Sequence, residues 1–321
     1  MVKKKCNLYT LVHMEFYNQD IISAKQFDRE KVEKFIKLAK KIEANKEKYS
    51  TLLKGKVMAA LFFEPSTRTR LSFESAFSYL GGKVIGFSSA GSSSVKKGET
   101  LADTIRTVAN YADIIVIRHS KEGAAKLAQQ FSDVPIINAG NGSQEHPTQG
   151  LLDCLAIHDL KGTLDGLNVG LIGDLKYGRT VHSLAHLLSN FNSNLYFISP
   201  DLLQMQYRVK DSLRLKNNNF KETTQFKETL PLLDVIYMTR IQKERFGDLE
   251  EYDKVKNAFI LTPKEMKLVK DDAIILHPLP RVNEISPEID SDPRAKYFEQ
   301  TYHGLMMRKA LLASILLKEI E

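Results

Sequence analysis

This chain of 321 residues has only two cysteines and no long apolar run, and both absences exclude classes of protein. Cys6 and Cys154 lie far apart, and two cysteines in a chain of this length do not make a disulfide framework. Cys154 lies in the apolar run LLDCLAI, which favours a small buried core residue. Because no stretch of about 18 apolar residues is present, the sequence predicts no transmembrane helix. The N-terminal stretch also lacks a long apolar segment, which favours a cytoplasmic protein.

A concentrated basic tail is missing as well, although the net charge is +7. The basic residues are spread along the chain, and the densest stretches are 3–5 and 31–48. In 31–48 lysines alternate with glutamates, which is typical of a solvated helix face. This distribution argues against nucleic-acid binding. It favours a focused positive potential for a small phosphorylated or dicarboxylic substrate.

Apolar runs and helical periodicity alternate twice along the chain. Strands are predicted at 56–63, 84–88, 113–118, 134–139, 168–173, 194–199, 235–239 and 273–277. Helices are predicted at 31–44, 71–80, 99–111, 149–159, 180–188 and 303–318. The pattern predicts an α/β fold with two domains, each a mostly parallel sheet flanked by helices, and an active site in the cleft between them. The predicted domains are 1–148 together with the C-terminal helix 303–321, and 149–302, with a hinge near 150–166.

Polar residues cluster directly after the predicted strands. In open parallel sheets, ligands bind beyond the carboxyl ends of the strands. The clusters are 64–70, 118–119, 141–149, 173–180, 239–242 and 277–281. The sequence therefore places the candidate site among these six segments.

The segment EPSTRTR, residues 64–70, is suited to holding a phosphate. It precedes a predicted helix, and the first turn of a helix offers free N–H groups and the positive end of the dipole. Ser66 adds a hydroxyl donor, and Arg68 adds a planar fork that matches phosphate. The structural alternative is that Ser66 is only an N-cap, and we expect Arg70 to pair with Glu74 one turn later. The segment is not a P-loop, because G-K-[ST] and a glycine-rich turn are absent.

Five motifs in order resemble the catalytic chains of the aspartate carbamoyltransferase family, within the aspartate/ornithine carbamoyltransferase superfamily. They are EPSTRTR at 64–70, HPTQGLLD at 146–153, GDLKYGRTVHSL at 173–184, MTRIQKER at 238–245 and HPLPRVNEI at 277–285. The first two motifs occur across the transcarbamoylases, and the last three resemble the aspartate enzymes in particular. The resemblance spans nearly the whole chain.

The resemblance implies transfer of the carbamoyl group of carbamoyl phosphate to L-aspartate, the committed step of de novo pyrimidine biosynthesis, without a cofactor. By similarity, carbamoyl phosphate is bound by Ser66, Thr67, Arg68, Thr69, Arg118, His146, Gln149 and the backbone carbonyls of Leu279 and Pro280. The residues with implied catalytic roles are Arg68, Thr69, Arg118 and His146. The protein would place two anions and stabilise a developing oxyanion.

The resemblance also implies an aspartate site in the second half of the chain. Arg179, Arg240 and Gln242 would bind the carboxylates of aspartate. Glu64 would brace Arg179 when the domains close, and a purely structural glutamate is the alternative.

Ser93 and Lys97 belong to the serine-rich segment 91–100. The residues alone favour a flexible exposed loop. The resemblance implies that this loop crosses to the neighbouring subunit and that Lys97 contacts both phosphate and aspartate. A homotrimer of catalytic chains would then be the smallest active assembly. In some members such trimers join zinc-containing regulatory chains, and residues 119–130 resemble the region that meets them.

Metal and dinucleotide sites are not supported by the spacing of candidate residues. His182 and His186 lie four apart on a predicted helix, but the chain has no HExxH glutamate between them and no obvious third ligand. The glycines near 170–178 do not form G-x-G-x-x-G. The sequence therefore predicts no metal site and no nucleotide cofactor.

Three alternative functions fit the sequence less well. Ornithine carbamoyltransferases typically have His-Cys-Leu-Pro where this chain has His-Pro-Leu-Pro at 277–280, and no cysteine follows Cys154. Arg179 and Arg240 would also repel the ammonium group of ornithine. A transcarbamoylase for another amine and a non-catalytic scaffold that binds carbamoyl phosphate are the remaining alternatives. The intact motifs argue against a scaffold.

Overall fold

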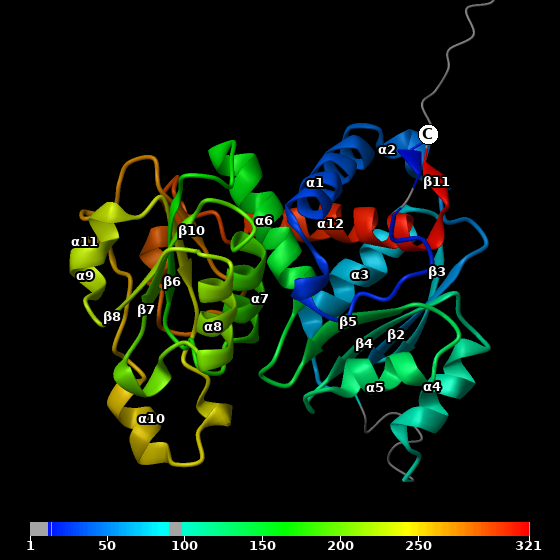
Figure 1. The fold of residues 1–321 in the computed structure, drawn as a ribbon, viewed down its shortest axis with the longest axis horizontal. Coiled ribbons are helices and arrows are strands. Elements are labelled where there is room, and N and C mark those ends of the chain that lie inside the picture. Colours follow the sequence, from blue (N-terminus) through cyan, green and yellow to red (C-terminus); the bar gives the residue numbers. More distant parts are fainter. Residues whose placement is uncertain (1–11, 14, 90–97, 321) are drawn as a thin grey trace, which may run out of the picture.

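Two parallel sheets, each in its own lobe, form the framework of the chain (Figure 1). The computed structural model describes residues 12–13, 15–89 and 98–320. The first lobe contains a four-stranded sheet and the second lobe a five-stranded sheet, and neighbouring strands in both are parallel. The predicted fold class, two α/β domains with parallel sheets, is confirmed. None of the helices in the described part of the chain is long and apolar enough to cross a membrane.

The first lobe surrounds the sheet in the order β3-β2-β4-β5. Its strands are β2 (Val57–Phe62), β3 (Lys83–Phe87), β4 (Ile114–His119) and β5 (Ile136–Asn141). Its helices are α1 (Arg29–Ala44), α2 (Lys46–Tyr49), α3 (Thr67–Tyr79), α4 (Leu101–Ala109) and α5 (Ala124–Gln130). Strand β2 is buried over five of its six residues, as expected for a central strand covered on both faces.

The second lobe surrounds the sheet in the order β10-β9-β6-β7-β8. Its strands are β6 (Asn168–Ile172), β7 (Asn194–Ile198), β8 (Phe220–Thr223), β9 (Val235–Met238) and β10 (Ile274–Leu276). Its helices are α7 (Arg179–Leu188), α8 (Tyr207–Leu215), α9 (Phe226–Thr229), α10 (Leu249–Val255) and α11 (Pro263–Met266). Strand β8 lies at the edge of this sheet, and the sequence did not predict it.

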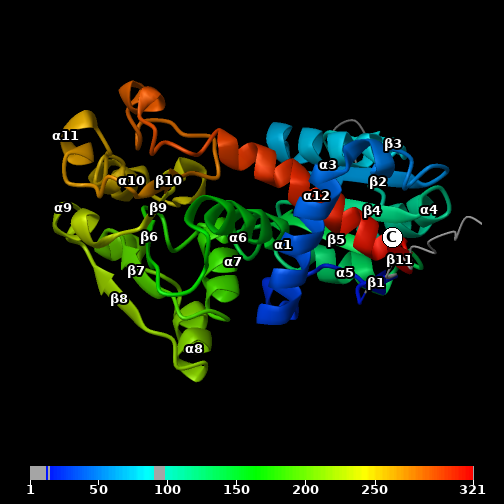
Figure 2. The same cartoon turned by 90° about the horizontal axis from the view of Figure 1, so that it is seen from above.

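Helices α6 (Pro147–Lys161) and α12 (Glu299–Leu316) pass between the lobes (Figure 2). Helix α6 packs on α7 and on α12, and α12 also packs on α1 and α3 of the first lobe. Both helices are buried around most of their circumference, so neither has a clear polar face. A short antiparallel pair, β1 (Val12–His13) with β11 (Glu319–Ile320), joins the two ends of the described chain.

Two helices begin four residues earlier than the sequence predicts. Helix α3 begins at Thr67 instead of residue 71, and α12 begins at Glu299 instead of residue 303. The first turns of both helices are polar, so apolar periodicity gives no signal there. The earlier start of α3 places the Thr-Arg-Thr-Arg run inside its first turn.

The strand order locates the site. In the first sheet the chain runs from β2 outward to β3 and returns to β4 on the other side of β2. In the second sheet it runs from β6 outward to β8 and returns to β9 on the other side of β6. Ligands bind at such switch points, beyond the carboxyl ends of the strands. The segments at the carboxyl ends of β2, β4, β6 and β9 are 64–70, 118–119, 173–180 and 239–242, and all four were predicted from the sequence as parts of the site.

Candidate active site

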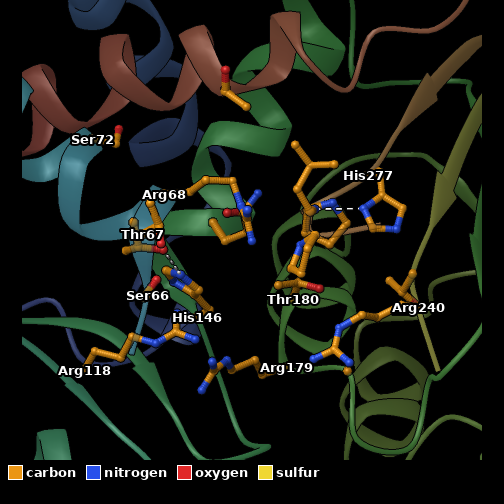
Figure 3. Close-up of a pocket in the computed structure, with 18 of the residues that line it drawn as sticks. Ser66, Thr67, Arg68, Ser72, Arg118, His146, Arg179, Thr180, Arg240 and His277 are labelled. Atoms are coloured by element: carbon orange, nitrogen blue, oxygen red, sulfur yellow. Dashed lines mark hydrogen bonds between the residues drawn. The ribbon is translucent and has the colours of Figure 1, made fainter. Parts of the chain in front are cut away.

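One cavity of about 510 Å³ lies between the two lobes and is bordered by both switch points. Its lining combines many cations with few acids. The charged side chains among the described lining residues are Arg68, Arg118, Arg179, Arg240, Arg245, Arg308, Glu64 and Glu244. Figure 3 shows Arg68 and Arg118 on the side of the first lobe and Arg240 on the side of the second, with Arg179 between them. An excess of guanidinium groups in a concave site favours anionic ligands.

The first turn of α3 forms one end of the cavity. Ser66 occupies the N-cap position of α3, but its side chain accepts no hydrogen bond from the helix backbone, so it does not act as a cap. Its hydroxyl is therefore left for the cavity. Thr69 is buried, whereas Arg68 extends into the open space. The predicted pair is confirmed one turn later, where Arg70 Nε donates to Glu74 Oε1 over 2.6 Å.

Arg118 at the end of β4 and Arg179 at the start of α7 share one carboxylate. Arg179 Nη1 donates to Glu64 Oε2 over 3.1 Å, and Arg118 Nε lies 3.4 Å from the same oxygen. The predicted contact between Glu64 and Arg179 is thus present. Burial, assisted by the charge of Arg179, lowers the pKa of Arg118 to about 9. Among the described residues Arg118 Nε has no hydrogen-bond partner.

Arg179 lies against a glycine for a steric reason. Gly140 in β5 has φ +117°, and a Cβ there would stand 3.2 Å from the Arg179 guanidinium carbon. The Arg179 Nη1 group also donates to the carbonyl of Gly142 over 2.9 Å. The end of β5 thereby holds a second-lobe arginine against the first lobe.

His146 precedes α6 at its N-cap position and is buried. Its backbone N–H donates to Ser183 Oγ on α7 over 2.9 Å, which fixes the start of α6 against the second lobe. The imidazole Nε2 lies 3.4 Å from Thr69 Oγ1. Burial, reinforced by the charge of Arg118, lowers the pKa of His146 well below the ordinary 6.5. The imidazole is therefore neutral at neutral pH.

Gln149 lies on the first turns of α6 and is fixed by a fully buried carboxylate. Its Nε2 donates to Asp153 Oδ1 over 2.9 Å. The same carboxylate accepts from Gln300 Nε2 over 2.6 Å and from the Tyr237 hydroxyl over 2.7 Å. Burial raises the pKa of Asp153 to about 7, although these donors oppose the rise. Because Gln149 presents its amide nitrogen to Asp153, its oxygen is the polar atom available to the cavity.

The turn after β10 forms part of the wall of the same cavity. Leu279 N–H donates to His277 Nδ1 over 2.8 Å, so Nε2 carries the proton of the neutral ring and donates to Glu284 Oε1 over 2.7 Å. Leu279 has φ +53°, which is uncommon for a residue with a Cβ and is held by these bonds. Leu279 and Pro280 both line the cavity.

The second-lobe end of the cavity holds the remaining predicted cation. Arg240, just after β9, makes an ion pair with Glu244, with Nη1 3.1 Å from Oε2. Gln242 Nε2 donates to Asp174 Oδ2 over 3.4 Å. Arg245 donates to the Gly142 carbonyl over 3.1 Å and thereby bridges the lobes. Together with Arg179, these side chains could hold a ligand with two carboxylates.

The structure brings together every predicted site residue that it describes. The predicted residues that line the cavity are Ser66, Thr67, Arg68, Thr69, Arg118, His146, Gln149, Arg179, Arg240, Gln242, Leu279 and Pro280. Ser93 and Lys97 lie outside the described residues. No group of three or more His, Cys, Asp or Glu side chains placed to hold a metal occurs in the described ranges.

Sequence reasoning missed several lining residues. Arg245 belongs to the motif at 238–245 and could have been found there. Gln300 and Arg308 lie on α12, which carries no motif. Arg308 is buried, donates to Ser72 Oγ over 2.8 Å and stacks 4.9 Å from the centroid of the Phe73 ring. No pattern in the sequence signals that α12 reaches the cavity.

Comparison with known proteins gives matches over both lobes. A family model described as the carbamoyl-P binding domain of aspartate/ornithine carbamoyltransferase matches residues 19–159, and one described as the Asp/Orn binding domain matches residues 165–315. The aspartate carbamoyltransferase catalytic subunit of Thermococcus onnurineus is 54% identical over 301 residues, covering 93% of this chain and 97% of that protein.

Solved structures agree with this assignment. Aspartate transcarbamoylase from Trypanosoma cruzi, in complex with carbamoyl phosphate and aspartate, is 42% identical with a TM-score of 0.90, covering 95% of this chain and 98% of that chain. The catalytic subunit of M. jannaschii aspartate transcarbamoylase is 47% identical with a TM-score of 0.84, covering 92% and 97%. On these matches and the cavity described above, the chain belongs to the aspartate/ornithine carbamoyltransferase family.

Proposed function

We propose that this chain catalyses transfer of the carbamoyl group of carbamoyl phosphate to L-aspartate, giving N-carbamoyl-L-aspartate and phosphate. The observation that carries the proposal is one cavity lined by six arginines and two glutamates. One end of this cavity is the N-terminus of α3, and the other end holds the arginines of the second lobe. The first end suits a phosphate, and the second suits two carboxylates. The names of the relatives support the same activity.

The phosphate of carbamoyl phosphate would lie at the first turn of α3. Ser66, Thr67 and Thr69 offer hydroxyl donors there, and Arg68 and Arg118 supply guanidinium groups. An anion would give the Arg118 Nε–H a hydrogen bond, which its ion pair with Glu64 does not supply. It would also offset the mutual repulsion of these arginines, which now contributes to the lowered pKa of Arg118.

The carbamoyl group would lie between His146 and Gln149. Thr69, Arg118 and His146 would donate to the carbonyl oxygen, on which negative charge develops. His146 would act as a neutral donor, since its pKa is well below 6.5. The nitrogen would be held by Gln149 Oε1 and the carbonyls of Leu279 and Pro280.

The reaction would need no covalent enzyme intermediate. The neutral amine of aspartate attacks the carbamoyl carbon and a tetrahedral intermediate forms. The bond to the phosphate oxygen then breaks, so that its electron pair leaves with phosphate, and the phosphate takes up the proton that the attacking nitrogen loses. The carboxylates of aspartate would be bound by Arg179, Arg240 and Gln242. Holding both substrates in line, and stabilising the oxyanion, would supply the rate enhancement.

We also propose that the active assembly is a homotrimer in which Ser93 and Lys97 complete the neighbouring cavity. Three observations support a covered surface here: β3 is an edge strand, Ile85 on it is exposed, and so are Leu71 and Tyr79 on α3. Segment 90–97 begins three residues after the end of β3. Two predictions from the sequence pattern remain predictions: the domain limits 1–148 with 303–321 and 149–302, and the cytoplasmic location. The role in pyrimidine biosynthesis and any regulatory chains remain predictions from the resemblance.

The amine specificity tests the proposed activity. The purified protein is supplied with carbamoyl phosphate and either L-aspartate or L-ornithine, and the carbamoylated amino acid is quantified. We expect turnover with aspartate and none above background with ornithine, because the arginine group repels an ammonium side chain. Preferred turnover of ornithine would overturn the assignment of Arg179 and Arg240.

A further inference from the structure

Gln300 on the first turn of α12 connects two parts of the cavity that belong to different elements. Its Nε2 donates to Asp153 Oδ1 over 2.6 Å, and its Oε1 accepts from the His277 backbone N–H over 2.9 Å. Both ends of the amide are therefore engaged, and the side chain is 2% exposed. This residue is missing from the motifs that the sequence analysis identified.

The first of these parts is the orientation of Gln149 on α6. Asp153 Oδ1 accepts from Gln149 Nε2 and from Gln300 Nε2, so the Gln149 amide turns its nitrogen toward Asp153 and its oxygen toward the cavity. Gln300 and Tyr237 donate to the same carboxylate and hold it in place. The orientation of Gln149 thus depends on groups from α12 and β9.

The second part is the turn at 277–280. Gln300 fixes the His277 backbone, and the His277 ring fixes Leu279 through its N–H. Glu284 holds the other side of the ring and also accepts from the backbone N–H groups of Val282 and Asn283, each over 3.1 Å. Gln300 therefore fixes the backbone at Leu279 and Pro280 through His277.

We infer that Gln300 is a positioning residue that holds Gln149 and the 277–280 turn in one register, so that their oxygens form a single acceptor set for an NH2 group. The inference rests on the proposed function, in which that group is the carbamoyl nitrogen. A site with paired acceptors discriminates strongly against an isostere that lacks the donors, because the acceptors are then left unpaired. Acetyl phosphate, with CH3 in place of NH2, is that isostere.

The test measures this discrimination in Gln300→Met, which keeps the side-chain length and removes both hydrogen bonds. We determine the KM of carbamoyl phosphate and the inhibition constants of acetyl phosphate and inorganic phosphate. The preference for carbamoyl phosphate over acetyl phosphate should fall roughly tenfold, the scale of one or two lost hydrogen bonds. The inhibition constant of inorganic phosphate, which lacks the NH2 group, should stay unchanged.

Gln26→Met is the matched control. Gln26 Oε1 accepts from the backbone N–H of Ile22 and of Ser23, and Nε2 donates to the Asp20 carbonyl over 2.8 Å. The same substitution therefore removes hydrogen bonds at both ends of an amide outside the cavity lining. We expect a lower Tm and an unchanged preference between the two acyl phosphates.

Gln300→Glu provides a second variant in case the methionine variant does not fold. It keeps the acceptor for the His277 N–H and replaces the amide donor by a carboxyl that must share a proton with Asp153. The contact with Asp153 is thus altered and the contact with His277 is kept, so the preference should fall by a smaller factor, roughly threefold. An unchanged preference, or equal weakening of carbamoyl phosphate, acetyl phosphate and phosphate, would overturn the inference and leave Gln300 a structural residue. Failure of the wild-type protein to carbamoylate aspartate would instead overturn the proposed function, and the inference with it.

Discussion

At the scale of single residues, the site is built from guanidinium groups that outnumber their carboxylate partners. Arg118 and Arg179 both lie beside one oxygen of Glu64, and their side chains are each only 13% exposed. Removing such charges from water is costly unless they are paired. This cost lowers the pKa of Arg118 to about 9, and the guanidinium still remains protonated at neutral pH. Anionic substrates would supply the missing partners.

Arg240→Ala should weaken aspartate binding selectively. The variant loses one guanidinium from the second-lobe end of the cavity, and hydrogen bonds to charged groups contribute roughly 1.5–3 kcal/mol. The KM for aspartate should rise roughly 10- to 100-fold, while inorganic phosphate binding, measured by calorimetry, should change little.

Arg214→Ala is the control for this variant, because Arg214 is an exposed arginine of α8 in the same lobe and does not line the cavity. Its KM for aspartate should match the wild type. An Arg240→Ala enzyme with an unchanged KM for aspartate would refute the assignment of this arginine to the carboxylates.

The predicted residues and the missed ones differ in how their contacts are encoded. Ser66, Arg68 and His146 lie in short motifs after strands, where the fold class alone says that ligands bind. Gln300 meets Asp153 across 147 positions, and its helix is buried on most sides. A single sequence holds no signal for such a contact, because it depends on how α6 and α12 pack.

At the scale of elements, the N-termini of α1 and α3 show two uses of the same position. In α1 the Asp28 side chain accepts from the Lys31 backbone N–H over 2.9 Å and caps the helix. In α3 the Ser66 side chain makes no such bond. The first turn of α3 thus keeps its donors for a ligand, at the expense of a cap that would stabilise the helix.

Ser66→Ala and Asp28→Ala should therefore separate binding from stability. Asp28→Ala should lower the free energy of unfolding by about 1 kcal/mol through loss of the cap, with phosphate affinity unchanged. Ser66→Ala should change stability by less than about 0.5 kcal/mol and weaken phosphate binding. Urea unfolding and calorimetric titration with inorganic phosphate measure the two quantities. A destabilised Ser66→Ala protein with normal phosphate affinity would show that Ser66 has only a structural role.

Elements with a clear apolar pattern were easier to predict than polar elements at the edge of a sheet. Helix α1 was placed within two residues at its start, since Val32, Phe35 and Ile36 form a buried stripe. The edge strand β8 is polar and only partly covered, so its sequence lacks the apolar run of a central strand. Tertiary packing, rather than local pattern, decides such elements.

At the scale of the whole molecule, each lobe contributes one end of the cavity, and the proposed trimer contributes a third part. Lys97 is the cation that the resemblance places in a neighbouring cavity, and it lies outside the described residues. A ring in which each chain completes its neighbour is a closed heterologous assembly. Loss of either the cavity arginines of one chain or Lys97 of its neighbour should then inactivate a site.

Mixed trimers test this sharing. Arg118→Ala and Lys97→Ala proteins should each be nearly inactive on their own. After joint dissociation and reassociation of equal amounts, about a quarter of the sites would combine an intact Arg118 with an intact neighbouring Lys97 in a closed ring. Recovery of about that fraction of wild-type turnover is expected, and each variant treated alone is the control. Absence of recovery in trimers shown to be mixed would contradict a shared site.

The most direct test of carbamoyl transfer is the stoichiometry of products made by the purified assembly from carbon-labelled carbamoyl phosphate and L-aspartate. Magnetic resonance follows the label, and a phosphate assay runs in parallel. The account predicts N-carbamoyl-L-aspartate and phosphate formed in equal amounts. Phosphate released without carbamoylated aspartate would contradict it, since the cavity would then hydrolyse the acyl phosphate without transferring its carbamoyl group.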